Sequence, residues 1–85
     1  MSMSFEGAVE HVTSLMGAGM RVSDEDMLML YKYYKQGTLG DIPADKARPA
    51  FYDVKGRSKH DAWASVKGTS VEVARAAYVS AVESL

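Results

Sequence analysis

Residues 23–41 read SDEDMLMLYKYYKQGTLGD, a stretch that contains a complete predicted helix with both of its ends. Ser23 favours the N-cap position, because its hydroxyl can accept a hydrogen bond from a backbone N–H of the first turn. Acids occupy residues 24–26, where the helix dipole favours negative charge. Gly40 is typical of the position that ends a helix. Between these ends, one face carries apolar and aromatic residues at helical spacing: Met27, Leu30, Tyr31 and Tyr34, with Leu28 beside them.

The segment before this helix shows the same period and therefore predicts a first helix. Its stripe ends at the glycine-rich residues 17–19 and consists of Phe5, Ala8, Val9, Val12, Leu15 and Met16. A long connection follows the Ser23 helix, over residues 41–55, with two prolines and no sustained period. We expect its aromatic residues, Phe51 and Tyr52, to hold this loop against the core.

Two further helices complete the chain. A short one is predicted from Ser58 to Lys67, with Ala62, Trp63 and Val66 facing inward and Gly68 ending it. Thr69 or Ser70 caps the last helix. Its apolar stripe is Ala74, Ala77, Tyr78, Ala81, Val82 and Leu85. The patterns predict an all-α fold of four helices with connections of unequal length.

Composition sets the class of protein. The chain has 85 residues, enough for one domain, and 47% hydrophobic with 25% charged residues is typical of a globular protein. No run approaches the ~18 apolar residues of a membrane-spanning helix. The absence of cysteine excludes disulfides. The N-terminus lacks the features of a secretory signal, so we expect a cytoplasmic protein by elimination.

The charge is unevenly distributed along the chain. Residues 32–67 hold eight of the ten basic residues but only four of the eleven acids. Such a basic middle could present a patch to a phosphorylated ligand, or could simply be solvated surface. It is too small for strong sequence-independent DNA affinity, so no nucleic-acid partner is expected.

No motif supports catalysis. The chain has no nucleophile elbow, no phosphate-binding P-loop and no HExxH zinc motif. His11 and His60 lie far apart without a metal-ligand pattern, and helix capping explains the acids at 24–26. We therefore expect no enzyme activity, no metal and no cofactor.

Aromatic and basic residues form the most informative cluster. Tyr31, Tyr34 and Lys35 share one helix face, and a basic run, Lys55–Lys59, precedes and opens the third helix. Taken singly, such tyrosines are usually core residues and such a run is usually solvated. Together they offer rings for a flat base and cations for phosphate, which suits a nucleotide-bearing ligand.

These residues resemble a known family. Residues 31–41 resemble the YxxYKQATxGD signature of acyl-CoA-binding proteins. Arg48-Pro49 followed by residues 53–63, DVKGRSKHDAW, is similar to the family's RP…D(F)KGKAKWDAW stretch. Shorter matches complete the order along essentially the whole chain: Phe5, residues 23–28, VKGTS at 66–70 and AYV at 77–79.

The resemblance implies a four-helix up-down-down-up bundle with a boat-shaped ligand site. It implies tight binding of medium- to long-chain acyl-CoA thioesters and no enzyme activity. Residues 1–85 would form a single acyl-CoA-binding domain. The protein would act as an intracellular carrier and pool former that delivers acyl-CoA to lipid-metabolising enzymes, its transient partners. A monomer without stable membrane insertion is expected.

The resemblance also implies roles for individual residues. Tyr31, Lys35 and Lys59 match the positions that hold the 3′-phosphate of CoA, and Tyr34 matches the tyrosine that stacks on adenine. The remaining head-group positions, near the nucleotide or the phosphates, are Lys55, Arg57 and Tyr78. The acyl-chain groove is expected to be lined by Phe5, Val9, Asp24, Met27, Leu28 and Leu30.

The chain departs from the family pattern in several places. His60 replaces a tryptophan, and Thr13 stands where a lysine near the phosphates is common. Gly37 replaces an alanine, which we expect to weaken its helix by up to ~1 kcal/mol. The loops at 16–22 and 43–47 are longer than is typical of the family.

Two other functions are compatible with the sequence. The departures at Thr13 and His60 allow a protein-interaction bundle that has lost its ligand. The chain could also be an accessory domain of a longer acyl-CoA enzyme. Met1 and the full set of motifs favour a stand-alone protein, and no feature supports a secreted signalling role.

Overall fold

A computed structural model describes residues 3–85 as four α-helices joined by loops. The helices are α1 (Phe5–Gly17), α2 (Asp24–Leu39), α3 (Val54–Ser65) and α4 (Val71–Glu83). No strand occurs within residues 3–85. The predicted all-α fold of four helices is therefore confirmed. Residues 1 and 2, part of the predicted domain 1–85, lie outside the described residues.

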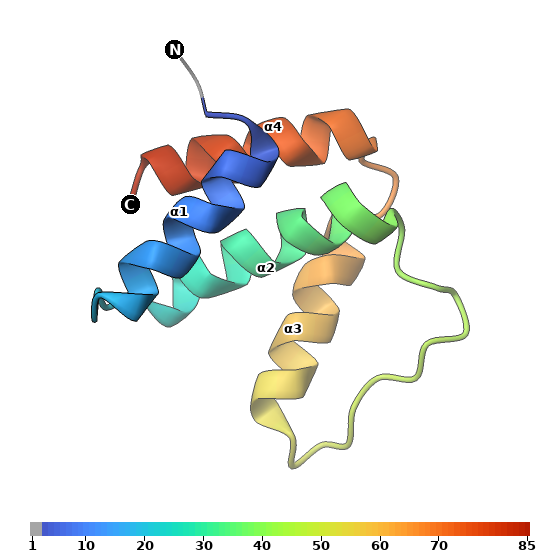
Figure 1. The fold of residues 1–85 in the computed structure, drawn as a ribbon. Coiled ribbons are helices and arrows are strands. Elements are labelled where there is room, and N and C mark those ends of the chain that lie inside the picture. Colours follow the sequence, from blue (N-terminus) through green and yellow to red (C-terminus); the bar gives the residue numbers. More distant parts are fainter. Residues whose placement is uncertain (1–2) are drawn as a thin grey trace.

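The helix α2 occupies the middle of the fold. It packs against both α3 and α4, while α1 packs against α4 (Figure 1). The C-terminal ends of α2 and α3 meet, and α4 starts from the same place and runs back beside α2 (Figure 1). This is the expected up-down-down-up order. The arrangement is shallow, with principal extents of 38 × 29 × 15 Å, so many side chains of α2 lie close to a surface.

Two apolar clusters hold the helices together. The larger joins α1, α2 and α4 through Ala8, Val12, Leu30, Tyr78, Val79 and Val82. The smaller consists of Ile42, Trp63 and Val66. Trp63 is 4% exposed, which confirms its predicted core position. Ile42 comes from the loop after α2, where no period indicated a buried residue.

A polar network, here called the junction, ties the end of α2 to α3 and to the start of α4. It consists of Gln36, Gly40, Asp41, Trp63, Gly68 and Thr69. The fully buried Gln36 donates from Nε2 to Asp41 Oδ1 and to the Thr69 carbonyl, each at 2.8 Å. Trp63 Nε1 donates to the Gly40 carbonyl at 2.9 Å. Gly40 and Gly68 have φ of 79° and 91°, in the left-handed region that favours glycine.

Asp41 is the acceptor at the centre of the junction. Its Oδ1 accepts from the Gly68 backbone N–H at 2.8 Å, in addition to Gln36. These two hydrogen bonds, with a smaller contribution from the charge of Lys67, lower the pKa of Asp41. The Gly-Asp end of the α2 signature therefore connects protein segments to one another.

The third helix begins earlier than predicted. It starts at Val54 rather than Ser58 and ends at Ser65 rather than Lys67. The reason is Asp53, which acts as N-cap because its Oδ1 accepts from the Gly56 N–H at 3.0 Å. For α4, the cap is Ser70, one of the two expected residues, whose hydroxyl accepts from the Val73 N–H at 3.1 Å.

The expected role of Phe51 and Tyr52 is wrong. Their side chains are 79% and 78% exposed, so they do not hold the loop against the core. Polar contacts to α3, here called the loop strap, do so instead. Arg48 forms two hydrogen bonds to Asp61, at 2.7 and 3.0 Å, and Arg57 Nε donates to the Pro49 carbonyl at 3.0 Å. The Arg48 hydrogen bonds lower the pKa of Asp61.

His60 also belongs to the loop strap. Its Nε2 lies 3.3 Å from the Lys46 carbonyl oxygen. Its buried Nδ1 makes no hydrogen bond to the described residues, although Asp61 Oδ1 lies 3.5 Å away. The histidine that replaces a tryptophan thus makes a polar contact between α3 and its preceding loop.

Candidate ligand-binding site between α2 and α3

Two cavities lie along α2 and share one lining residue, Met27. The larger has a volume of about 510 Å³, lies between α2 and α3, and is lined by Asp24, Met27, Leu28, Val54, Lys55, Ser58 and Lys59. The smaller, of about 170 Å³, is lined by Val12, Met27, Leu30, Tyr31, Tyr34 and Tyr78. Met27 lines both, so we treat them as one groove, called the α2 groove. Its wall is mainly apolar, with cations from α3 on one side.

Two lysines converge on one ring beside this groove. Lys35 Nζ lies 5.8 Å and Lys59 Nζ 5.6 Å from the centre of the Tyr31 ring. Lys35 Nζ also lies 5.4 Å from the Trp63 ring. Among residues 3–85, neither ammonium group pairs with a carboxylate. Cation–π attraction holds the charges at the rings, and two unneutralised cations at one ring favour a multiply charged anion.

An aromatic cluster lies next to the lysine pair. The ring centres of Phe5, Tyr34 and Tyr78 are 5.2–6.1 Å apart. Tyr78 is buried, and this burial raises its pKa, with a smaller effect from the neighbouring Tyr34. Tyr34 is 40% exposed, so part of its ring remains open to a ligand while Phe5 and Tyr78 support the ring from within. The exposure fits a stacking surface better than a fully buried core position.

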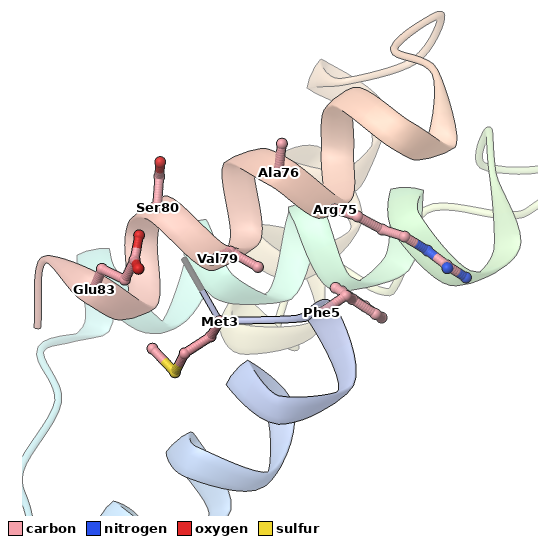
Figure 2. Close-up of a pocket in the computed structure, with 7 residues that line it drawn as sticks. All are labelled: Met3, Phe5, Arg75, Ala76, Val79, Ser80 and Glu83. Carbon is pink, nitrogen blue, oxygen red and sulfur yellow. The ribbon is translucent and has the colours of Figure 1, made fainter. Parts of the chain in front are cut away.

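Phe5 also borders a separate cavity, lined mainly by α4. That cavity, of about 360 Å³, is lined by Met3, Phe5, Arg75, Ala76, Val79, Ser80 and Glu83. Figure 2 shows Phe5 and Arg75 together at one end of it and Met3 and Glu83 at the other. Arg75 Nε donates to the Gly37 carbonyl at 2.8 Å, and its guanidinium carbon lies 4.9 Å from the Phe5 ring centre. Arg75 thus joins α4 to α1 and α2.

The close approach of Arg75 also gives Gly37 a structural role. A Cβ at position 37 would lie 3.0 Å from Arg75 Cγ and 3.6 Å from the Phe5 ring. An alanine there would therefore require Arg75 to move. The glycine that departs from the family signature lets α4 pack closely against the end of α2.

The structure brings most of the predicted site residues to the α2 groove. Those lining it are Asp24, Met27, Leu28, Leu30, Tyr31, Tyr34, Lys55, Lys59 and Tyr78. Lys35 lies beside it over Tyr31. The other three lie differently: Arg57 contacts the Pro49 carbonyl, Val9 packs against the larger core cluster, and Phe5 lines the cavity of Figure 2.

On the α3 side of the groove, sequence reasoning missed two residues, Val54 and Ser58. Both were assigned to the loop or to the very start of the third helix, because that helix was expected to begin four residues later. The N-cap at Asp53 was the signal that could have placed them, since a capping aspartate moves residues 54–58 onto the first helical turns. Val12, predicted only as a core residue, also reaches the groove.

The described residues contain no arrangement of three or more His or acidic side chains suited to a metal ion. Among the helices of residues 3–85, none is long and apolar enough to cross a membrane. What the site offers is an apolar groove along α2, a half-exposed tyrosine ring and an unneutralised lysine pair. These features suit an amphipathic, anionic ligand and are those of a helical binding protein.

Comparison with known proteins identifies the family. The sequence model of the family described as Acyl CoA binding protein matches residues 2–82 of this chain. Acyl-CoA-binding protein homolog 1 of Caenorhabditis elegans is 40% identical over 85 residues, which cover 100% of this chain and 93% of that protein. The Acyl-CoA-binding protein homolog of Drosophila melanogaster is 41% identical with the same coverage.

The fold agrees with these relatives. The crystal structure of ACBP from Moniliophthora perniciosa superposes with a TM-score of 0.82 at 44% identity, covering 95% of this chain and 78% of that one. The chain therefore belongs to the acyl-CoA-binding protein family, a family of binding proteins and not of enzymes.

Proposed function

We propose that this protein binds medium- to long-chain acyl-CoA thioesters with high affinity. It acts as a monomeric cytoplasmic carrier and pool former that delivers them to lipid-metabolising enzymes, and residues 1–85 serve as a single acyl-CoA-binding domain. The observation that carries the proposal is the unneutralised pair Lys35 and Lys59 over Tyr31, at the side of an apolar groove.

The 3′-phosphate of CoA is assigned to the lysine pair. A phosphate between the two ammonium groups would neutralise charges that now have no carboxylate partner in the described residues. The Tyr31 hydroxyl is assigned as a further donor, because Tyr31 also lines the groove. Each charge-assisted hydrogen bond contributes about 1.5–3 kcal/mol, so the phosphate dominates recognition of the head group.

Adenine is assigned to the open part of the Tyr34 ring. Phe5 and Tyr78 support this ring from within, so the stacking surface is already in place before the ligand binds. Stacking of a base on an aromatic side chain is worth about 1–3 kcal/mol. Tyr78 acts mainly through this support, because it is itself 4% exposed.

Two more cations serve the remaining phosphates. Lys55 is exposed and lines the larger cavity, so its ammonium group is free to reach a phosphate there. Arg57 uses Nε for the loop strap, which leaves its other N–H groups for a ligand. Lys55 thus serves as a direct contact, and Arg57 combines structural and ligand roles.

The acyl chain is assigned to the larger cavity between α2 and α3. Met27 and Leu28 form its floor, Val54 adds an apolar wall from α3, and the 510 Å³ volume leaves room for a hydrocarbon segment. Leu30 is only 5% exposed, so it offers the acyl chain little contact surface. Each methylene removed from water adds up to ~0.8 kcal/mol, from which the cost of ordering the chain is subtracted. Affinity should therefore rise with chain length.

Calorimetric titration tests this function. The ligands are acyl-CoA esters graded in chain length, free CoA and free palmitate. We expect submicromolar binding that strengthens with chain length, with both fragments weak, because CoA lacks the tail and palmitate lacks the phosphate. Trp63 is the only tryptophan and lies under Lys35, so its fluorescence supplies a second readout of the head group. Absent binding across the whole series would contradict the carrier role and favour a protein-interaction bundle.

A further inference from the structure

One serine on α3 lines the α2 groove and keeps its hydroxyl free. Ser58 is half-buried and lines the larger cavity together with Lys55 and Lys59. Other hydroxyl groups on the helices, such as those of Thr13 and Ser65, donate to a carbonyl of their own helix. Within residues 3–85, the Ser58 hydroxyl forms no hydrogen bond to α3 or to its neighbours. It is therefore available for chemistry in the groove.

Basic residues surround this serine in the sequence and in the cavity. Lys55 and Arg57 precede it by three and one positions, and Lys59 follows it. Residues three apart on a helix share one face, with Cβ atoms about 5–6 Å apart, so Lys55 lies beside Ser58. Neither lysine forms an ion pair within the described part of the chain. An anionic group on Ser58 Oγ would therefore have two ammonium groups as partners.

The charge of the larger cavity is positive by a small margin. Its lining residues include two lysines and one acid, Asp24, which lies in the first turn of α2, where the helix dipole stabilises a carboxylate. A phosphate ester carries about −1.5 to −2 charges at neutral pH. One phosphate on Ser58 would therefore reverse the sign of the cavity, which would then repel an anionic ligand.

The sequence before Ser58 suits a protein kinase that recognises basic residues. Charge patterns next to the acceptor residue provide much of the specificity of kinases for their substrates. No other serine of the chain has two basic residues within the three positions before it. The family stretch KGKAKWDAW has an alanine where this chain has Ser58, so the motif itself does not require the hydroxyl.

The position of Ser58 in the fold also gives a kinase access. The serine is the fifth residue of α3, which begins at Val54 after the long loop. In Figure 1 this start of α3 lies at the end of the helix remote from α4. Helix ends open at a lower cost in free energy than core segments, and a kinase binds its substrate as an opened segment.

We propose that Ser58 is a phosphorylation site for a protein kinase that recognises basic residues, and that its phosphate closes the α2 groove to anionic ligands. In the transfer, Ser58 Oγ bonds to the γ-phosphorus of ATP and the bond from that phosphorus to the bridging oxygen breaks. ADP leaves, and the hydroxyl proton passes to the aspartate base of the kinase. The new phosphate pairs with Lys55 and Lys59. That this pairing excludes acyl-CoA rests on the proposed function, in which Lys59 binds the 3′-phosphate.

Phosphorylation of the folded chain tests the site. The full chain is incubated with MgATP and the catalytic domain of protein kinase A or of protein kinase C, and tandem mass spectrometry locates the phosphate. Ser58→Ala should lose the phosphate. The matched control is Ser65→Ala, which changes a serine of the same helix with no basic residue in the three positions before it and should keep the phosphate. Absence of phosphate on Ser58 of the unmodified chain with both kinases would overturn the proposal.

Phosphorus NMR tests whether the phosphate pairs with the lysines. The second pKa of phosphoserine is about 6 in the absence of charged neighbours. Two ammonium groups should lower this pKa, because they favour the doubly charged form. The decrease should be smaller in the Lys55→Ala variant, and an equal pKa in both phosphorylated chains would show that Lys55 does not pair with the phosphate.

Calorimetric titration tests the closure of the groove. The phosphorylated chain should bind acyl-CoA roughly ten- to hundredfold more weakly than the untreated chain, and phosphatase should restore the affinity. Kinase treatment should not change the affinity of the Ser58→Ala variant, and thermal melting checks that each chain is folded. Equal affinities of the phosphorylated and untreated chains would overturn the closure. Failure of the untreated chain to bind acyl-CoA would overturn the carrier role, while mass spectrometry and NMR would still decide whether Ser58 is a phosphorylation site.

Discussion

The junction and the α2 groove use neighbouring residues of one helix in opposite ways. In the junction, Gln36 donates two hydrogen bonds within the protein while it is fully buried. One residue earlier, Lys35 carries a charge that no described carboxylate neutralises, over two aromatic rings. The signature at 31–41 therefore divides into a half available to a ligand and a half that holds the fold together. A sequence motif can thus combine binding and packing residues without any visible boundary between them.

The largest effect is expected from breaking the junction at Trp63. Trp63→Ala removes most of the smaller core cluster and the hydrogen bond to Gly40, so we expect the free energy of unfolding to fall by about 3–5 kcal/mol. Trp63→Phe keeps a ring and loses mainly that bond, so its cost should be nearer 1 kcal/mol. Denaturant unfolding followed by circular dichroism measures both. A loss below 1 kcal/mol for the alanine variant would show that the junction does not depend on this side chain.

The half of the signature that faces the groove is tested by comparing two single lysine variants. Lys59→Ala removes one of the two cations over Tyr31 and should weaken acyl-CoA binding by about 1.5–3 kcal/mol with little change in stability. The control is Lys32→Ala, since Lys32 also lies over a tyrosine, at 5.2 Å from the Tyr33 ring, but away from the groove. Isothermal titration of both variants gives the comparison. Equal acyl-CoA affinities of the Lys59→Ala and Lys32→Ala variants would show that Lys59 does not contribute to the binding site.

The start of α3 shapes the groove wall. Alanine variants at two glycines test whether the Asp53 cap stabilises this helix start. A Cβ at Gly56 would meet the Asp53 carboxylate and displace the helix cap, whereas a Cβ at Gly17 would meet nothing within 4 Å. Alanine is otherwise the better helix former at both positions. We expect Gly56→Ala to be less favourable than Gly17→Ala by about 1 kcal/mol in unfolding free energy. Equally stable variants would mean that the Asp53 cap contributes nothing to the early start of α3.

The smallest change in stability is expected from lowering the pH, through protonation of Asp41. The pKa of Asp41 in the folded protein lies below its ordinary value of 3.8, so this carboxylate stabilises the fold fully above that pH. The stabilisation is then lost as the pH falls through the lowered pKa. The stability difference between the unmodified chain and Asp41→Asn should be constant near neutrality and narrow below about pH 4. Urea unfolding at several pH values measures it, and a difference that widens in acid would contradict the assignment.

Much of the architecture could be predicted because local rules decide it. The caps at Ser23 and Ser70 satisfy orphan N–H groups of their own first turns, so a few adjacent residues carry the signal. Likewise, the stripes of α1 and α4 place Ala8, Val12, Tyr78 and Val82 in the core by helical period alone. The start of α3 was misplaced because a capping aspartate preceded by a turn resembles an ordinary loop.

The long loop shows where prediction by residue type fails. Aromatic side chains usually mark the core, and this rule placed Phe51 and Tyr52 there. The structure instead anchors the loop through Arg48, Arg57 and His60, whose partners lie eight to fourteen residues away. Which of several charged groups pairs with which depends on the path of the loop over α3, and no local pattern contains that information.

Local patterns predict the number of helices, most of their ends and the main core stripe, and the order of the motifs predicts the family to which the chain belongs. Each of these follows from residues that lie within a few turns of one another or from a motif read in order. The packing of the helices places Lys35 and Lys59, 24 positions apart, over the ring of Tyr31, buries Gln36 and leaves Phe51 and Tyr52 in solvent. The physical reason is that charge proximity and burial depend on how α2, α3 and the loop pack, which involves contacts between distant parts of the chain.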